Sequence, residues 1–425
     1  MHWRLHEGFP NLDRESLIKY AREIGLDVKR FTKDIDTMAH MDIINRDLTL
    51  AKKLDLYNTP TFFINNRKIV GNVPYAYLKK KVEEALRKTQ PQGLQIEPVE
   101  PFTLATERAR KMAELGRMLF FDRRLSGDGT MSCATCHNPE LGYTDGLAIS
   151  LSYPTTRNWR NAPTIINVAY LDSYFWDGRA ESLEQQALFP IMSAFEMNQN
   201  LDYLEEELKE VPYYRKAFRE IFGGPINRMF IAQALAAFQR TIVSTNSPLD
   251  RYLKGDTSAL SSLEKLGYEV FKGKGRCILC HYGPNLTDNK FHNLGVPENP
   301  EIIDDPRVAA TRRFTAKVSG YKDYDNLKTD PGRYLVTKSD KDWKAFRTPT
   351  LREIARTAPY MHNGVFKTLE EVVEFFDRGG GSDPRKSPLL KVLHLSKKEK
   401  KALVEFLRHG LSGQYPIVKP PALPE

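Results

Sequence analysis

Apolar residues recur at helical spacing along most of the chain, and short strand-like runs occur only near its beginning. The apolar positions of residues 14–30 predict an amphipathic helix, and a second helical stretch runs to about residue 56. Residues 57–64 predict a turn into a strand, followed by a hairpin turn at 65–67 and a strand at 68–70. A helix from Pro74 to about Arg87 completes an α/β unit over residues 1–88.

The remainder of the chain predicts a mostly α fold. Residues 89–101 are rich in Pro and Gln without a period, which is typical of a linker. Residues 102–411 are predominantly helical, and residues 412–425 form a Pro-rich tail that we expect to be extended. The richest apolar stretch, 229–243, is interrupted by Gln and Arg, so the sequence predicts no membrane span.

Composition and charge narrow the classes of function. With 425 residues, 41% of them hydrophobic, the chain is long enough for two or three domains with packed cores, which excludes wholesale disorder. The 63 Lys and Arg exceed the 54 Asp and Glu, but these charges are scattered. We therefore expect no nucleic-acid partner.

All four cysteines lie in two Cys-x-x-Cys-His motifs, Cys133–His137 and Cys277–His281. This spacing lets two thiols add to the vinyl groups of one heme while the histidine ligates its iron. A zinc site would need the two pairs close together, and they lie far apart in the sequence. A thioredoxin-type redox pair would follow a strand and would not need the histidine twice. Cys133, Cys136, Cys277 and Cys280 therefore predict two covalently bound heme c groups, with His137 and His281 as iron ligands.

Heme c attachment in bacteria takes place outside the cytoplasm, yet residues 1–13 show no secretory signal. The segments 5–7, 24–27 and 58–65 resemble the C-terminal part of DsbA-like thioredoxin-fold proteins, in which the bond at Thr59-Pro60 is cis and faces the redox pair. The Cys-x-x-Cys half of that domain is not in the chain. Either the start is incomplete or the unit is a redox-dead remnant. We favour the first reading, and we expect a periplasmic protein whose first unit has no disulfide activity.

Residues 102–411 resemble the bacterial diheme cytochrome c peroxidases and, among them, the MauG-like branch. The motifs that carry the resemblance are 115–122, 160–164, 175–180, 183–187, 195–197, 281–284, 291–295, 349–352 and 358–364. The resemblance implies two cytochrome c domains, 102–256 and 257–411. The first would hold the peroxide-reacting heme, and the second the electron-transfer heme.

Three residues acquire catalytic roles from this resemblance. Glu196 matches the carboxylate that moves a proton between the two peroxide oxygens. Gln186 matches an amide that hydrogen-bonds bound peroxide, and Trp176 matches a tryptophan that carries electrons between the hemes. Asn161, with the backbone carbonyls of Thr357 and Pro359, matches a calcium site at the domain junction, whose oxygen ligands suit a hard cation.

The sequence departs from the family pattern at both hemes. Tyr153 stands where peroxidases have a histidine cap on the first heme, and no histidine occurs between His137 and His281. We expect this heme to be open, although Tyr153 remains an alternative ligand. Phe376 stands where the second heme finds its sixth ligand, which leaves that heme five-coordinate or bound by Met361. His292 and His362 fit family motifs as supporting residues rather than iron ligands.

These patterns predict a diheme c-type oxidoreductase that uses hydrogen peroxide as electron acceptor. Electrons would pass from the C-terminal heme through Trp176 to the N-terminal heme. They would come from a small cytochrome c or cupredoxin, or from oxidisable residues of a protein substrate. The alternative is a non-enzymatic electron carrier or redox sensor, which Phe376 favours because the second heme has lost its usual ligand.

Overall fold

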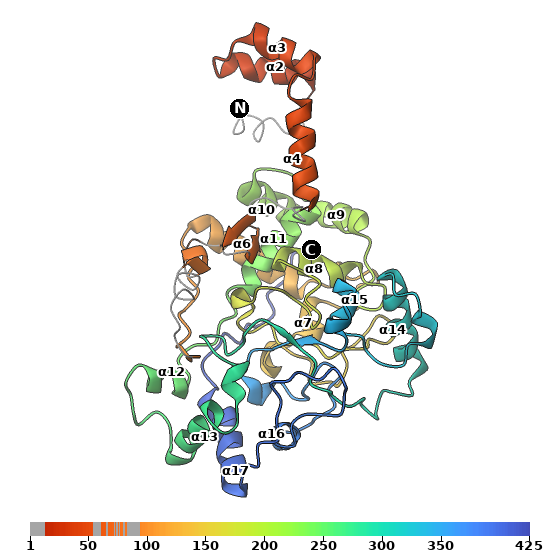
Figure 1. The fold of residues 1–425 in the computed structure, drawn as a ribbon. Coiled ribbons are helices and arrows are strands. Elements are labelled where there is room, and N and C mark those ends of the chain that lie inside the picture. The colour runs from red at the N-terminus through yellow and green to blue at the C-terminus, as the bar shows by residue number, and fades with distance from the viewer. Residues whose placement is uncertain are drawn as a thin grey trace. The chain divides into compact units, whose positions relative to one another are not determined.

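A computed structural model of the chain describes residues 13–53, 61–64, 67–71, 73, 75, 77–79, 81–82 and 94–425. The chain divides into two compact units, residues 1–72 and 73–425, and each is described by itself (Figure 1). In the first unit the structure describes three helices, α2 (Arg14–Glu23), α3 (Val28–Asp36) and α4 (Met41–Lys53). Further along the chain, strands β1 (Thr61–Ile64) and β2 (Arg67–Val70) pair antiparallel.

The single helix expected over residues 14–30 is wrong. Helix α2 ends at Glu23, and Gly25 follows with a φ of 74°, a conformation that a helix does not continue. The side chain of Asp27 then accepts a hydrogen bond from the backbone N–H of Arg30 and caps α3. The two predicted strands are present, with β2 beginning one residue earlier than expected. Thr59-Pro60 and residues 5–7, which carried the DsbA resemblance, lie outside the described residues.

The second unit is mostly helical. Residues 75, 77–79 and 81–82 are helical, which agrees with the helix expected from Pro74. The first group of longer helices is α6 (Glu107–Phe121), α8 (Leu183–Met192), α9 (Leu201–Glu210), α10 (Pro212–Phe222) and α11 (Arg228–Gln239). The second group is α12 (Pro248–Leu253), α13 (Ser262–Lys272), α14 (Pro306–Val318), α16 (Leu369–Asp377) and α17 (Lys397–Glu405).

Short elements complete this unit. Helices α7 (Cys133–Cys136) and α15 (Tyr334–Thr337) are single turns, and strands β3 (Phe291–His292) and β4 (Phe346–Arg347) pair antiparallel. The remaining turns are the 3-10 segments Arg123–Leu125, Pro139–Leu141, Val168–Tyr170, Cys277–Leu279, Tyr324–Asn326, Asp340–Asp342 and Ile354–Arg356, and the π segment Phe406–Gly410.

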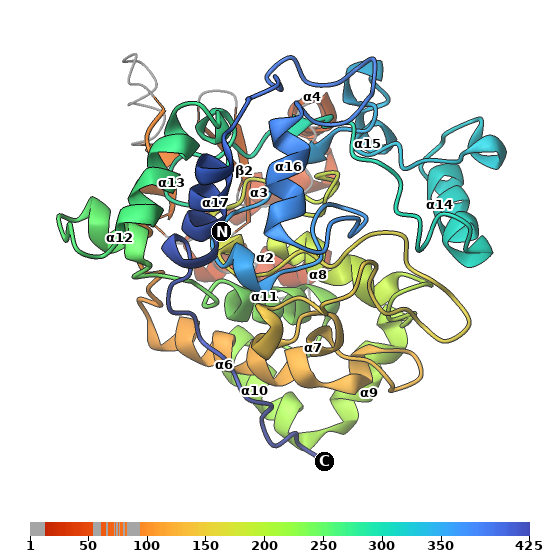
Figure 2. The same ribbon diagram turned by 90° about the horizontal axis from the view of Figure 1, so that it is seen from below.

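Three apolar clusters lie in the described part of this unit. The first is built mainly from α6 and α8–α11, the second from α13, α16 and α17, and a smaller third one includes Trp159, Val308 of α14 and Leu335 of α15. Figures 1 and 2 show these helices. Each of the first two clusters contains a helix crossing at a glycine. A Cβ on Gly116 of α6 would lie 1.8 Å from the carbonyl oxygen of Ala234 in α11, and one on Gly267 of α13 would lie 2.1 Å from that of Ala402 in α17. Only glycine allows such close approaches.

The Pro-rich tail is extended, as expected, and it contacts the first core. The Tyr143 hydroxyl donates to the carbonyl of Pro416 at 2.8 Å, and the Arg124 guanidinium donates to the carbonyl of Pro424 at 2.8 Å. Figure 2 shows the tail running past α6 and α10 to the C-terminus. The last residues of the chain therefore pack against the same region that carries the first Cys-x-x-Cys-His motif.

Candidate functional site

The first Cys-x-x-Cys-His motif forms one helical turn followed by a half-buried histidine. Helix α7 holds Cys133 and Cys136, and His137 ends the turn. The Nδ1 atom of His137 lies 3.1 Å from the carbonyl oxygen of Tyr143. A carbonyl only accepts, so Nδ1 carries the hydrogen and Nε2 keeps its lone pair. Burial also lowers the pKa of His137, which keeps the ring neutral and able to bind a metal.

The second motif is built in the same way. Cys277 begins a 3-10 turn, and Nδ1 of His281 lies 2.8 Å from the carbonyl oxygen of Leu286, so Nε2 is again left free. Burial lowers the pKa of His281 as well. Burial raises the pKa of Cys133 and of Cys277 to about 12, so these thiols are neutral. The two histidines are therefore both prepared as neutral Nε2 ligands.

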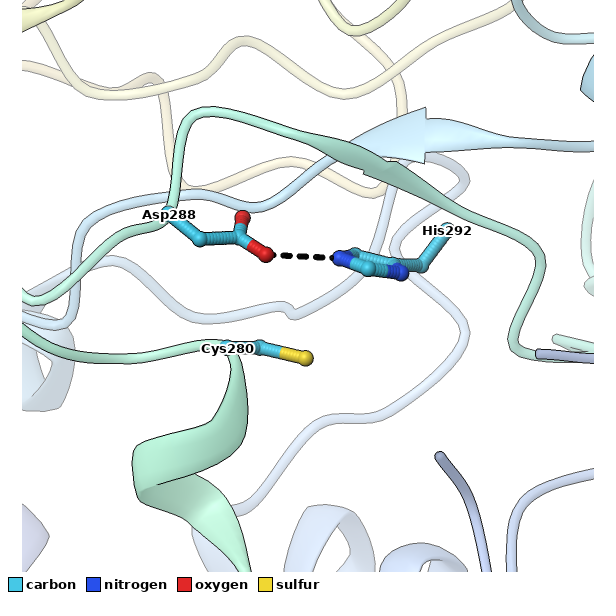
Figure 3. Close-up of side chains that lie close together, drawn as sticks. All are labelled: Cys280, Asp288 and His292. Atoms are coloured by element: carbon cyan, nitrogen blue, oxygen red, sulfur yellow. Dashed lines mark hydrogen bonds and ion pairs between the residues drawn. The ribbon is translucent and has the colours of Figure 1, made fainter. Parts of the chain in front are cut away.

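The four thiols do not converge on a common zinc site. Within the described ranges, the side chains whose possible metal-ligand atoms lie close together are Cys280, Asp288 and His292, and this cluster contains a single cysteine (Figure 3). Nε2 of His292 lies 2.8 Å from Oδ2 of Asp288. Burial alone would lower the pKa of His292, but hydrogen bonds to Asp288 and Cys280 raise it to about 9. Because Cys280 belongs to the second motif, Asp288 and His292 lie directly beside that motif.

The second motif lines a cavity of about 220 Å³. Its wall is mainly apolar and includes Cys277, Cys280 and His281. Phe376 and Met361, the two residues weighed at the sixth-ligand position, both line this cavity. Such a cavity, with two thiols and a free imidazole nitrogen in its wall, fits a heme bound covalently.

Two of the residues expected around the first heme, Glu196 and Tyr153, lie at one turn, and Gln186 lies on the helix before it. Glu196 lies in the turn after α8. Burial raises the pKa of the Cys136 thiol, and the negative charges of Asp145 and Glu196 raise it further. The backbone N–H of Tyr153 donates to the carbonyl of Phe195 at 3.2 Å, which brings Tyr153 to the same turn. Gln186 lies near the start of α8. The turn that contains Glu196 folds back on the end of this helix, because the backbone N–H of Met197 donates to the carbonyl of Pro190.

Trp176 is held through both its side chain and its backbone. Its indole N–H donates to the carbonyl of Asn161 at 2.9 Å, and its own carbonyl accepts from the backbone N–H of Arg347 at 2.8 Å. Trp176 also lines the cavity around the second motif. Asn161, Thr357 and Pro359, the residues expected to bind calcium, line this cavity too. The amide of Asn161 donates to the carbonyl of Leu147 at 2.7 Å.

A buried group of charges adjoins Trp176. The guanidinium of Arg160 binds both carboxylate oxygens of Asp330, at 2.7 and 2.8 Å, and Asp177 at 2.6 Å. Asp177 also accepts from Arg179 at 3.0 Å. His362 lies near this group, stacks on Phe346 with ring centroids 3.7 Å apart, and has a pKa lowered by burial to about 4. The group therefore joins the chain around residue 160 to that around residue 330.

Sequence reasoning gave no role to Arg160, Asp330 or Arg347. Arg160 belongs to the family motif at 160–164, but its partner Asp330 lies 170 positions away, and a single sequence carries no signal for that pairing. Arg347 stands two residues before the family motif at 349–352, and only the structure shows that it lines the cavity.

Comparison with known proteins supports this geometry. The family model for di-haem cytochrome c peroxidase matches residues 110–258, and the model for the DSBA-like thioredoxin domain matches residues 1–83. Cytochrome-c peroxidase IdrP1 of Pseudomonas sp. strain SCT is 46% identical over 324 residues, which cover 75% of this chain and 85% of the relative. The chain belongs to the di-haem cytochrome c peroxidase family. Membership in this family implies two heme c groups and a peroxidase-type oxidoreductase.

Other relatives place the chain near both branches of this family. The methylamine utilization protein MauG of Methylorubrum extorquens is 36% identical, with 76% of this chain and 84% of the relative covered. A solved MauG-like protein associated with microbial copper homeostasis matches with a TM-score of 0.62 at 29% identity, covering 78% of this chain and 97% of that one. No helix in the described part of the chain is long and apolar enough to cross a membrane.

Proposed function

We propose that this protein is a periplasmic diheme peroxidase that reduces hydrogen peroxide in the MauG-like mode. The observation that carries the proposal is the pair of half-buried Cys-x-x-Cys-His turns, each with its histidine Nδ1 bonded to a carbonyl and its Nε2 free. Cys133, Cys136 and His137 would hold the first heme, and Cys277, Cys280 and His281 the second. The hemes would supply the electrons that reduce peroxide to water.

The protein's own residues would handle the proton and position the peroxide. Glu196, at the turn next to Cys136, would take the proton from one peroxide oxygen and deliver it to the other. Gln186 would hydrogen-bond the bound peroxide. Trp176 would connect the two heme regions. It lines the cavity at the second motif, and hydrogen bonds to its indole N–H and its carbonyl fix its position. Two cytochrome c domains, 102–256 and 257–411, remain our assignment for this part of the chain.

The open first site distinguishes the MauG-like mode from the histidine-capped mode. Tyr153 lies beside the turn that carries Glu196, and we assign it as a pocket residue rather than an iron ligand. Electrons would enter through the second heme from a small cytochrome c or cupredoxin, or from a protein substrate. The relatives named cytochrome-c peroxidases support a cytochrome donor.

A calcium ion at the junction is part of the proposal. Among the described residues, no hydrogen bond reaches the side-chain oxygen of Asn161 or the carbonyls of Thr357 and Pro359, and all three residues line the same cavity. Unbonded oxygens in a shared wall suit a hard cation. The ion would hold the two heme regions in register.

The residues matched by the DSBA-like model contain no cysteine, so we assign them no disulfide chemistry. We regard this unit as part of a thioredoxin-like fold attached to the peroxidase.

The test is the optical spectrum of the fully ferric, heme-loaded protein before and after stoichiometric hydrogen peroxide, with no reductant. An immediate change at the ferric hemes is expected if the first site is open. A response only after one electron is supplied would instead indicate a capped heme and the peroxidase mode. Silence in both states would leave an electron carrier or redox sensor.

Substitution of Glu196 tests its proton transfer. Glu196→Gln should slow peroxide turnover roughly 10²-fold or more while the ferric spectrum stays unchanged. Glu206→Gln is the matched control, because Glu206 is exposed and pairs only with Lys209 in the described contacts. Equal rates for Glu196→Gln and the control would remove Glu196 from the mechanism.

A further inference from the structure

Arg347 is a buried cation in the cavity wall that forms no ion pair with a described carboxylate, although the charge of Asp172 acts on it from a longer distance. It is 5% exposed and lines the cavity around the second Cys-x-x-Cys-His motif. Its Nε donates to the carbonyl of Phe175 and its Nη1 to that of Thr348, both at a long 3.3 Å. No carboxylate of the described residues forms an ion pair with it.

Among the described residues, three other buried arginines, Arg160, Arg240 and Arg352, have such partners, whereas the buried Arg312 forms no ion pair and does not line this cavity. Arg240 lies 2.8 Å from Glu184, and Arg352 lies 2.8 Å from Asp250. An uncompensated buried charge costs several kcal/mol, which is why buried guanidinium groups are normally paired. Burial lowers the pKa of Arg347 to about 10, and the group is still a cation at neutral pH. Arg347 therefore provides an anion site that no side chain described here fills.

We propose that the guanidinium of Arg347 binds a propionate carboxylate of the heme held by Cys277, Cys280 and His281. The cavity is mainly apolar, and a heme is a ligand that brings carboxylates into such surroundings. Arginine suits a carboxylate because its planar donors form two parallel hydrogen bonds. Lys391 also lines this cavity, but it is exposed and so has water as a partner. The inference rests on the heme attachment in the proposed function, and on nothing about peroxide.

This contact makes Arg347 a positioning residue for the second heme. A buried cation next to the heme offsets the propionate charge, and its removal leaves an unpaired anion that favours the ferric, more positive iron. The backbone N–H of Arg347 also holds the carbonyl of Trp176 at 2.8 Å. One residue thus touches both the second heme site and the tryptophan between the two heme regions.

Redox titration of the heme-loaded protein tests the proposal, with electron paramagnetic resonance separating the two ferric hemes. In Arg347→Gln the reduction equilibrium of the second heme should move toward the oxidised form by about tenfold or more, and tenfold corresponds to about 59 mV for one electron. Arg347→Lys, which keeps the charge, should retain most of the wild-type potential. Lys391→Gln is the control and should leave the equilibrium within about twofold, because solvent screens its charge.

Equal potentials in Arg347→Gln and Lys391→Gln would overturn the proposal. If Arg347→Gln does not accumulate with heme, Arg347→Lys and the wild type are compared by redox-difference infrared spectroscopy with heme labelled in its propionate carboxylates. A labelled carboxylate band that differs between the two is expected, and an identical band would also overturn the proposal. Loss of peroxide reactivity with an unchanged potential shift would count against the proposed function alone.

Discussion

Asp330→Asn should destabilise the second unit through the buried charge group at Trp176. Asp330 and Arg160 are each 7% exposed, and the carboxylate binds the guanidinium through both of its oxygens. Asparagine removes the charge and turns an NH₂ group toward a donor. Breaking a buried pair costs about 3–5 kcal/mol, and we expect the lower end, about 3 kcal/mol, because Arg160 keeps Asp177.

Urea unfolding of the heme-loaded protein measures this effect. With a slope of about 3 kcal/mol per molar urea for a unit of this size, the midpoint should fall by about 1 M. Asp325→Asn is the matched control, since Asp325 is exposed in the same region and should change stability by no more than about 0.5 kcal/mol. A midpoint for Asp330→Asn within the range of this control would refute the reasoning that the buried pair stabilises the unit.

Two further predictions concern pH and the second heme. Burial alone would raise the pKa of Asp177, but Arg179 and Arg160 lower it to about 2. A lowered carboxyl pKa stabilises the folded state above about pH 4 and loses that contribution as the pH falls toward 2, so roughly 2 kcal/mol of stability should disappear across this range in the wild type. The same urea titration at pH 5, 4 and 3 should show a flatter dependence in Asp177→Asn, and equal slopes would contradict the assignment. Phe376→Met should give the second heme a thioether ligand and a low-spin ferric spectrum. Phe375→Met, whose parent side chain is buried beside Phe366 outside the cavity wall, should not, and an unchanged spectrum in Phe376→Met would place residue 376 out of reach of the iron.

Local features were predictable because a few neighbouring residues determine them. The Cys-x-x-Cys-His turns and the helix and hairpin classes follow from spacings within ten residues of each other. The error over residues 14–30 has a local cause as well. The apolar period continues through the sequence, but Gly25 takes a positive φ and Asp27 caps a new helix, so chain geometry overrides the hydrophobic pattern.

Features that depend on distant pairs could not be predicted. The ligand role of His137 follows from its motif, yet the bond from its Nδ1 to Tyr143 that leaves Nε2 free appears only in three dimensions. The same holds for Asp330, whose partner is 170 positions away, and for Arg347, whose burial without a carboxylate has no signature in the sequence. Family motifs could suggest candidate site residues, whereas residues defined only by their surroundings left no signal in the sequence.

The contacts of Trp176 and Asp177 suggest a role for the buried charges of Arg160, Asp177 and Asp330. Hydrophobic residues of similar volume often stabilise a fold as well as a buried ion pair does, so stability alone does not account for the group. The group does fix geometry. The indole of Trp176 is held by Asn161, its carbonyl by Arg347, and the carboxylate of the next residue, Asp177, by Arg160. Two separate parts of the chain, residues 160–161 and Arg347, therefore hold two consecutive residues. These contacts fix the position of the Trp176 ring, which we propose connects the two heme regions.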